Sequence, residues 1–240
     1  MIERNILLSV FLLIALPVCS QVNELFSDGN FTSEPVWSGT SELFKVNSKK
    51  QLQSAGVGSE SSFLSTPMTL DLGDAQTSWS FYIKLSFNPS DLNFARSYLL
   101  SDTQNLFEPL NGYFLQIGNA SDQIALYRSD NGVPTLLIEG EKGRMSGTLN
   151  AFRLKVSRSK EGTWSLSVKR EEDGEYSTEG TVADNTYRNG GWFGFACTYT
   201  QSRKSNFYMD DILIDQGEGS PDDPDLPDNP DDPDDPIIPD

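Results

Sequence analysis

Carboxylates are the first side chains that could do chemistry here, because the 240 residues include no histidine. Its absence excludes Ser-His-Asp and Cys-His catalysis and histidine-ligated zinc. Glycoside hydrolysis needs two carboxylates, one to protonate the leaving group and one to attack or to activate water. The nearest groups are Glu139-Gly140-Glu141, which has the composition of a turn, and the loop cluster 171–175. Neither lies on an apolar strand, so the sequence predicts a non-enzyme, with a glycosidase kept as an alternative.

Aromatic residues out of phase with their apolar neighbours could form a sugar-binding face. Trp192 alternates with the apolar residues of segment 193–199, so if those face the core, Trp192 faces outward. Gly194 and Ala196 would share its side and leave the ring unobstructed. Flat aromatic rings bind the CH faces of pyranoses, while nearby polar groups fix orientation. Further candidates for the same ligand face are Phe114, Tyr127, Tyr82, Gln116 and Arg96. A loop that covers this second face is the alternative.

Two consecutive aspartates, Asp210 and Asp211, pose a question of charge burial. They lie in segment 208–212, where strand alternation would point neighbouring side chains to opposite faces. One carboxylate would then face away from solvent or sit at a strand end, where a charge requires a partner.

The elements that must position these residues are strands. In segment 79–87 every odd position is large and apolar while the even positions are mostly polar, which is the period of a half-buried strand. Trp79, Trp164 and Cys197 are in phase with apolar neighbours and are interpreted as core. Turn-forming residues such as Asn189-Gly190-Gly191 separate the strands. The sequence predicts an all-β, two-sheet antiparallel sandwich. Further strands are expected at 98–100, 113–117, 124–127, 136–138, 152–156, 164–168, 193–199 and 207–214.

The first 20 residues have the pattern of a secretory signal. Arg4 precedes an apolar run, residues 6–16, that is too short to span a bilayer. Val18-Cys19-Ser20 then offers a cleavage site before Gln21. The alternative is a lipoprotein acylated at Cys19, although Val18 is bulky for that motif. Export to the cell surface or medium is expected in both cases, without a membrane span.

Residues 220–240 differ from the body in composition. Proline recurs at every third position from Pro221 to Pro239, among nine aspartates and no lysine or arginine. This spacing favours an extended polyproline II linker or tail, which could lead to a further module. The body is then residues 21–219. The whole chain has a formal charge of −17, so nucleic acid is not an expected partner.

Six motifs occur in order along the body: FSDGNF at 26–31, PVWSG at 35–39, NFARSYLLSD at 93–102, GYFLQIG at 112–118, CTYT at 197–200 and FYMDDI at 207–212. In these the chain resembles a group of exported Bacteroidetes proteins in which a concanavalin A-like jelly-roll domain precedes a lamin-tail or other module. The resemblance implies a lectin-like β-sandwich (jelly roll, concanavalin A-like lectin or glucanase type) in a cell-envelope or secreted protein.

The resemblance to carbohydrate-binding jelly rolls also implies a structural Ca²⁺ between the first and last strands. Asp28, Asp210 and Asp211, with backbone carbonyls, would be its ligands. The alternative is that the aspartate caps a turn or pairs with Arg203 or Lys204. The predicted function is a non-catalytic glycan-binding or display module. A structural spacer or protein-adhesion domain without a small ligand is the alternative.

Overall fold

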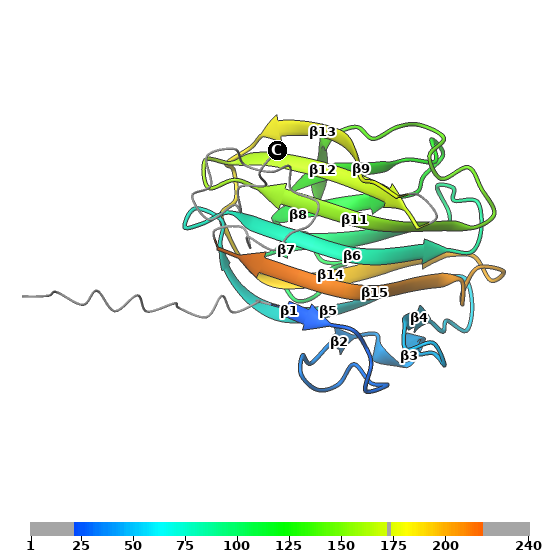
Figure 1. The fold of residues 1–240 in the computed structure, drawn as a ribbon. Coiled ribbons are helices and arrows are strands. Elements are labelled where there is room, and N and C mark those ends of the chain that lie inside the picture. Colours follow the sequence, from blue (N-terminus) through cyan, green and yellow to red (C-terminus); the bar gives the residue numbers. More distant parts are fainter. Residues whose placement is uncertain (1–21, 172–173, 218–240) are drawn as a thin grey trace, which may run out of the picture.

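The computed structural model describes residues 22–171 and 174–217, and these form two antiparallel sheets that pack face to face (Figure 1). The all-β, two-sheet prediction is confirmed. The only helix in these ranges is the 3-10 turn η1 (Ser41–Leu43), and it is far too short to cross a membrane. The predicted signal with Cys19 and the Asp-Pro segment 220–240 lie outside the described residues.

The eight-stranded sheet contains both chain ends of the described body. Its order is β13 (Ser177–Ala183), β12 (Thr163–Arg170), β11 (Asn150–Arg158), β6 (Thr77–Leu85), β15 (Phe207–Gln216), β4 (Leu52–Ser54) and β3 (Phe44–Val46), with β1 (Val22–Glu24) also paired to β15.

The seven-stranded sheet forms the second layer. Its order is β10 (Val133–Ile138), β9 (Ile124–Asp130), β8 (Gly112–Ile117), β7 (Phe94–Ser101), β14 (Asn189–Tyr199), β5 (Glu60–Asp71) and β2 (Ser38–Gly39). In Figure 1 it lies behind the eight-stranded sheet.

The core lies between the sheets and is rich in aromatic rings. Trp79 of β6 stacks on Trp164 of β12, with ring centroids 5.5 Å apart and planes 15° from parallel. Tyr113 of β8, on the other sheet, packs against Trp164, with the two ring centroids 4.3 Å apart. Both tryptophans and Cys197 are buried, as their phase in the strands predicted. Burial raises the pKa of the Cys197 thiol to about 12, so this thiol is protonated and inert at neutral pH.

The sequence analysis did not predict β5, which is the longest strand of the described residues. Its sequence ESSFLSTPMTLD is rich in serine and threonine and contains Pro67, which disguises the apolar alternation. In the fold Ser62, Ser65 and Thr66 are buried. Their hydroxyls find partners such as the Gln104 and Val36 carbonyl oxygens, at 2.9 and 3.0 Å. Hydrogen bonding therefore makes polar strand residues compatible with a buried position.

Candidate functional site

Two adjoining hollows, of about 410 and 250 Å³, lie on the outer face of the seven-stranded sheet. Their linings share Phe94, Arg96, Phe114 and Pro134, so together they form one continuous depression, here called the outer-face groove. Its size is in the range of small-ligand sites in proteins. Among the residues predicted for a sugar-binding face, Arg96, Phe114, Gln116 and Tyr127 line it.

The floor of the groove is a row of aromatic rings on neighbouring strands. Tyr98 of β7 is opposite Phe114 of β8, which is opposite Tyr127 of β9. The Phe114 and Tyr127 rings stack with centroids 5.3 Å apart and planes 8° from parallel, and Tyr98 lies 5.4 Å from Phe114. Side chains opposite one another on antiparallel strands contact directly, so strand register alone assembles this row. Phe114 is only 3% exposed, which makes it a support for the floor.

Arg96 is held in a fixed orientation beside these rings. Its guanidinium carbon lies 4.8 Å from the Phe114 ring centroid and 5.5 Å from that of Phe94. Its Nε donates a hydrogen bond to Gln116 Oε1 at 2.8 Å, and Gln116 Nε2 donates to the Gly118 carbonyl at 2.9 Å. The second bond fixes which end of the amide faces Arg96.

One wall of the groove is the loop 102–111 between β7 and β8. Leu106 and Leu110 anchor this loop by packing with Phe63, Tyr98, Phe114 and Ala196 in a small apolar cluster outside the main core. Phe107 remains 50% exposed, with its ring 5.0 Å from that of Phe63. A second wall, which adjoins the first, is the turn from β9 to β10 with Val133 at the start of β10, and Val133 is 64% exposed. Both walls therefore carry an exposed apolar side chain.

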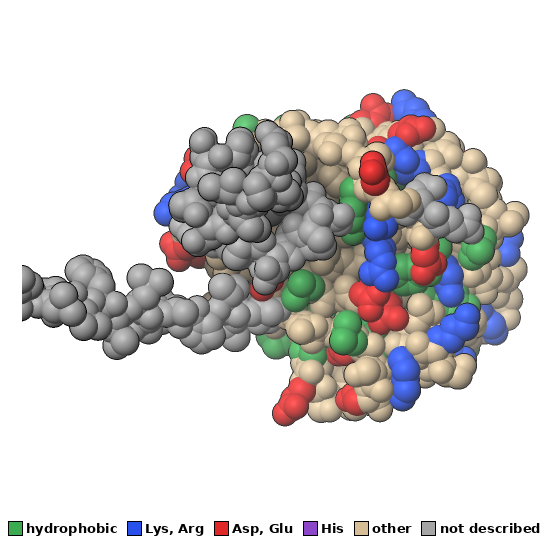
Figure 2. All heavy atoms as spheres, in the orientation of Figure 1, with side chains coloured by type: hydrophobic (Ala, Val, Ile, Leu, Met, Phe, Trp, Pro, Cys, Tyr) green, Lys and Arg blue, Asp and Glu red, His purple; other side chains and the backbone are tan. Residues whose placement is uncertain are grey.

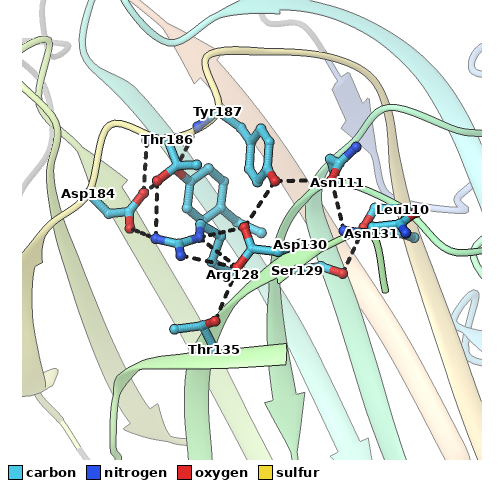
Figure 3. Close-up of polar contacts among 11 residues, drawn as sticks. Leu110, Asn111, Arg128, Ser129, Asp130, Asn131, Thr135, Asp184, Thr186 and Tyr187 are labelled. Atoms are coloured by element: carbon cyan, nitrogen blue, oxygen red, sulfur yellow. Dashed lines mark hydrogen bonds and ion pairs between the residues drawn. The ribbon is translucent and has the colours of Figure 1, made fainter. Parts of the chain in front are cut away.

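Next to these walls lies a polar network that joins them (Figure 3). Arg128 of β9 pairs with Asp130 at 2.9 Å and with Asp184. Asp184 also accepts a hydrogen bond from the Tyr113 hydroxyl at 2.5 Å and from the Thr186 amide at 3.0 Å. The network thus connects the segment before β14 to β8 and β9.

The same network reaches the two walls through Tyr187 and Asn111. The Tyr187 hydroxyl lies 2.9 Å from Asp130 Oδ1 and 3.0 Å from Asn111 Oδ1. Asn111 ends the loop wall and also accepts a hydrogen bond from the Asn131 amide of the turn wall at 2.8 Å. Ser129 Oγ donates to the Leu110 carbonyl at 2.8 Å. These bonds hold loop and turn at a fixed separation (Figure 3).

The carboxylates of this network do not suit glycoside hydrolysis. Hydrogen bonding to Arg128 is the main cause that lowers the pKa of Asp130. Burial alone would raise the pKa of Asp184, but hydrogen bonds from Tyr113, Thr186 and Arg128 outweigh it, and the pKa is lowered. A glycosidase requires one carboxyl group that stays protonated to act as the acid. With both groups ionised and bound to one arginine, this pair lacks the acid.

Trp192 lies on the same outer face but does not line the groove. The sequence analysis expected Gly194 and Ala196 to leave its ring unobstructed. The structure corrects this, because Leu106 of the loop wall packs over them. A Cβ on Gly194 would lie 2.6 Å from Leu106 Cδ1 and 2.7 Å from the Leu64 carbonyl oxygen. The loop therefore separates Trp192, which is partly buried, from the groove.

Tyr82 belongs to β6 of the eight-stranded sheet, so it cannot share a face with the other ligand candidates. Its hydroxyl donates to Glu171 Oε2 at 3.1 Å, and the guanidinium carbon of Arg153 lies 5.9 Å from its ring centroid. Figure 2 views this outer face and shows acidic and basic side chains intermixed over it. Tyr82 itself is only 4% exposed, so it lies beneath charged side chains on the opposite side of the molecule.

A β-bulge resolves the charge-burial question at Asp210 and Asp211. Asp211 adopts a left-handed backbone (φ 49°), and the pairing of β15 with β6 shifts between Asp210 and Leu213. The extra residue lets Met209 and Ile212 both face the core. Neither aspartate then points into the core: Asp210 is partly buried, and Asp211 pairs with Arg153 at 2.8 Å. The sequence analysis erred because strict alternation cannot anticipate a bulge.

The predicted calcium ligands do not come together. Within residues 22–171 and 174–217 no three acidic or cysteine side chains are grouped in a way that could hold a metal ion. Asp28 is exposed and its carboxylate bonds to Asn30. The residues present therefore do not fit the calcium site expected at Asp28, Asp210 and Asp211.

We expect replacement of Asp210 by asparagine to stabilise the protein at pH 7. Burial, followed by the adjacent Asp211 charge, raises the pKa of Asp210 to about 6, above the ordinary 3.8. The folded state therefore binds a proton more tightly than the unfolded state, and stability increases as pH falls from 7 towards 4. Solvent screens this partly exposed charge. We expect D210N to raise Tm at pH 7 by about 2–4 °C, equivalent to about 1 kcal/mol in a domain of this size.

Thermal melts of D210N and the wild type between pH 4 and 8 measure this effect. The matched control is D211N, which removes the neighbouring carboxylate and its Arg153 pair. Parallel profiles for wild type and D210N would show that Asp210 titrates normally.

Phe94 and Phe107 are groove residues that sequence analysis missed. Phe94 begins β7 and Phe107 lies in a loop, so neither belongs to a period that could reveal its direction. A usable signal was the apolar content of segment 106–110, since a loop with two leucines and a phenylalanine needs a surface to cover.

Several solved structures share this fold. The Ca²⁺- and mannose-bound VIP36 exoplasmic/lumenal domain matches with a TM-score of 0.58 at 11% identity, over 77% of this chain and 83% of that chain. The carbohydrate-binding module CBM66 from Bacillus subtilis gives 0.53 at 13%, over 75% and 95%. The potassium-bound Emp46p carbohydrate recognition domain gives 0.59 at 8%, over 83% and 97%. No family model and no curated protein matches. At these identities the likeness shows that the chain has the lectin-like β-sandwich fold.

Proposed function

We propose that the protein is a non-catalytic glycan-binding module and that the outer-face groove is its binding site. The observation that carries this proposal is the convergence of an oriented arginine, a buried amide and an aromatic floor in one depression of sugar size. Aromatic faces and a few fixed polar groups are the usual means of holding a sugar ring. The neighbours of this fold include carbohydrate-binding domains, which supports the proposal.

The proposed setting is the cell surface or the extracellular medium. It rests on the signal-like first 20 residues, and the proline-aspartate segment 220–240 would link the module to another. The context of exported Bacteroidetes lamin-tail proteins also remains a prediction. The lumenal or exoplasmic location of VIP36 is a property of that protein and is only consistent with export.

We expect Y127A and F107A each to weaken glycan binding about tenfold, equivalent to 1.4 kcal/mol. Tyr127 and Phe107 are groove aromatics that are not buried, as is Phe94, and truncation removes a stacking surface. The full chain would be titrated against a panel of soluble polysaccharides by affinity electrophoresis, then by calorimetry for each polysaccharide that retards it.

The matched control is Y208A, which truncates a partly exposed tyrosine on the outer face of the opposite sheet. Equal losses from Y208A and Y127A would place binding elsewhere. W192A tests in addition whether the ligand extends past Leu106 towards Trp192. A folded protein that no polysaccharide retards would contradict the proposal.

Protein adhesion is the second candidate function. The rim residues Phe107 and Val133, with Leu136 nearby on β10, are 50, 64 and 45% exposed. Exposed apolar side chains around a depression are also typical of protein contact surfaces. Under this reading the same variants would weaken binding of a protein partner, and no polysaccharide would bind.

A further inference from the structure

Arg96 gives the outer-face groove a positive charge at its centre. We propose that the groove binds glycans that carry carboxylates, such as uronic acids, and that Arg96 binds the carboxylate. This inference rests on the proposed glycan-binding function and names its ligand class.

Arg96 is the one lysine or arginine among the described residues that line the groove, and it borders both hollows. Three other arginines of the described chain are neutralised locally, since Arg128, Arg144 and Arg153 each have a side-chain nitrogen within 3 Å of a carboxylate oxygen. Arg96 takes part in none of the ion pairs within residues 22–171 and 174–217. Among these described residues its charge therefore has no ion-pair partner, and Arg96 borders a depression that a ligand can enter.

The donors of Arg96 are presented in a fixed plane. Nε is used by Gln116, and Nη1 makes only a long contact of 3.5 Å to the Tyr98 hydroxyl. None of its hydrogen bonds within the described ranges uses Nη2. The rings of Phe94 and Phe114 restrict rotation of the guanidinium. A planar guanidinium with free N–H groups matches the two oxygens of a carboxylate. Because the side chain is already ordered, binding costs little further conformational entropy.

Two acidic side chains at the groove favour a ligand that carries no more than one negative charge on each sugar ring. Asp91 borders the smaller hollow and Glu108 the larger one, and both are exposed. These carboxylates can accept hydrogen bonds from sugar hydroxyls, but they would repel a densely charged ligand such as a polysulfated chain. A uronic acid has one carboxylate on a ring whose CH face can contact an aromatic side chain. A uronic acid can therefore bind Arg96 through its carboxylate and the aromatic side chains through its CH face.

The test compares charged polysaccharides with neutral forms of the same backbone. The full chain would be titrated in EDTA with polygalacturonate, alginate and hyaluronate, each beside its carboxyl-reduced form. We expect at least one of the three to bind at least tenfold more tightly than its reduced form. R96Q should weaken binding of that polymer about 10- to 100-fold, the usual range for one charge-assisted hydrogen-bonding pair.

Two further variants separate geometry from charge. R96K keeps the charge but lacks the planar fork, so we expect it to restore only part of the affinity. K45Q removes an exposed lysine of β3 on the other sheet, and it should bind as the wild type does. Circular dichroism in the near ultraviolet checks that each variant is folded.

The possible failures are distinguishable. If a neutral polysaccharide binds and Y127A weakens it, while no uronate is preferred over its reduced form, the carboxylate inference is overturned and the glycan-binding proposal stands. If R96Q binds a preferred uronate as tightly as the wild type, Arg96 is not the carboxylate partner. If neither charged nor neutral polysaccharides bind the folded protein, both proposals fail.

Discussion

Replacing Trp164 with alanine is expected to lower the free energy of unfolding by about 3–5 kcal/mol, a large part of the stability of a typical domain. The indole is fully buried, stacks on Trp79 and packs against Tyr113. Its Nε1 donates to the Asp184 carbonyl at 3.1 Å. Truncation would remove contacts from both sheets at once and leave a cavity. Urea unfolding followed by far-ultraviolet circular dichroism measures the loss.

The matched control for this variant is W192A. It removes the same side chain from the partly exposed outer face, where the transfer and cavity terms are smaller. We expect a loss of about 1 kcal/mol there. Similar losses for the two variants would contradict the assignment of Trp164 to the shared core.

Replacing Asp184 with alanine is expected to lower stability by about 3 kcal/mol and to weaken glycan binding, although Asp184 does not line the groove. Its side chain is only 7% exposed, and its loss leaves Arg128 and the Tyr113 hydroxyl short of a partner. Removing one member of a buried charged pair is costly because the other stays desolvated. The network that aligns the loop and the turn would then loosen.

The pH dependence identifies the charge as the cause. The pKa of Asp184 is lowered in the folded protein, so the unfolded chain takes up a proton first as pH falls. The contribution of Asp184 is present above its ordinary pKa of 3.8 and is lost at lower pH. We expect the wild type to lose stability below about pH 4 more steeply than D184N, which keeps the shape and removes the charge. Identical slopes for the two proteins would rule out Asp184 as a source of acid sensitivity.

The architecture could be predicted from sequence because most strands bury one face. Alternation in segments such as 79–87 and 152–156 identified β6 and β11, and the phase of Trp79 and Trp164 placed them inside. The method failed where burial is not apolar, as in β5, and where the period breaks, as at Asp211. Both failures have one physical origin. Hydrogen bonds of buried polar side chains and β-bulges depend on which strands are neighbours. The sequence of one strand does not say which strand pairs with it.

The candidate site was predictable only in part for the same reason. The outward direction of Phe114 and Tyr127 follows from their phase, and both lie in the groove. Tyr82 has the same phase relation to its own strand, but the sheet to which that strand belongs is decided by long-range pairing. The loop 102–111, which covers Gly194 and builds one wall, is placed by contacts of Leu106 and Leu110 that no periodicity encodes.

The pairing of β1 with β15 brings the two ends of the described body together, which suits it to insertion into another protein. Val22 is opposite Ile214, so the chain enters and leaves the described body at neighbouring points of the eight-stranded sheet, away from the groove on the other layer. Domains whose ends adjoin tolerate insertion into a host protein and circular permutation. In a circular permutant, a short peptide would join the two ends and new termini would be opened in the turn at Lys160-Glu161-Gly162. We expect this permutant to keep the same fold. The folded body, and the groove with it, could then be inserted into a loop of an unrelated protein.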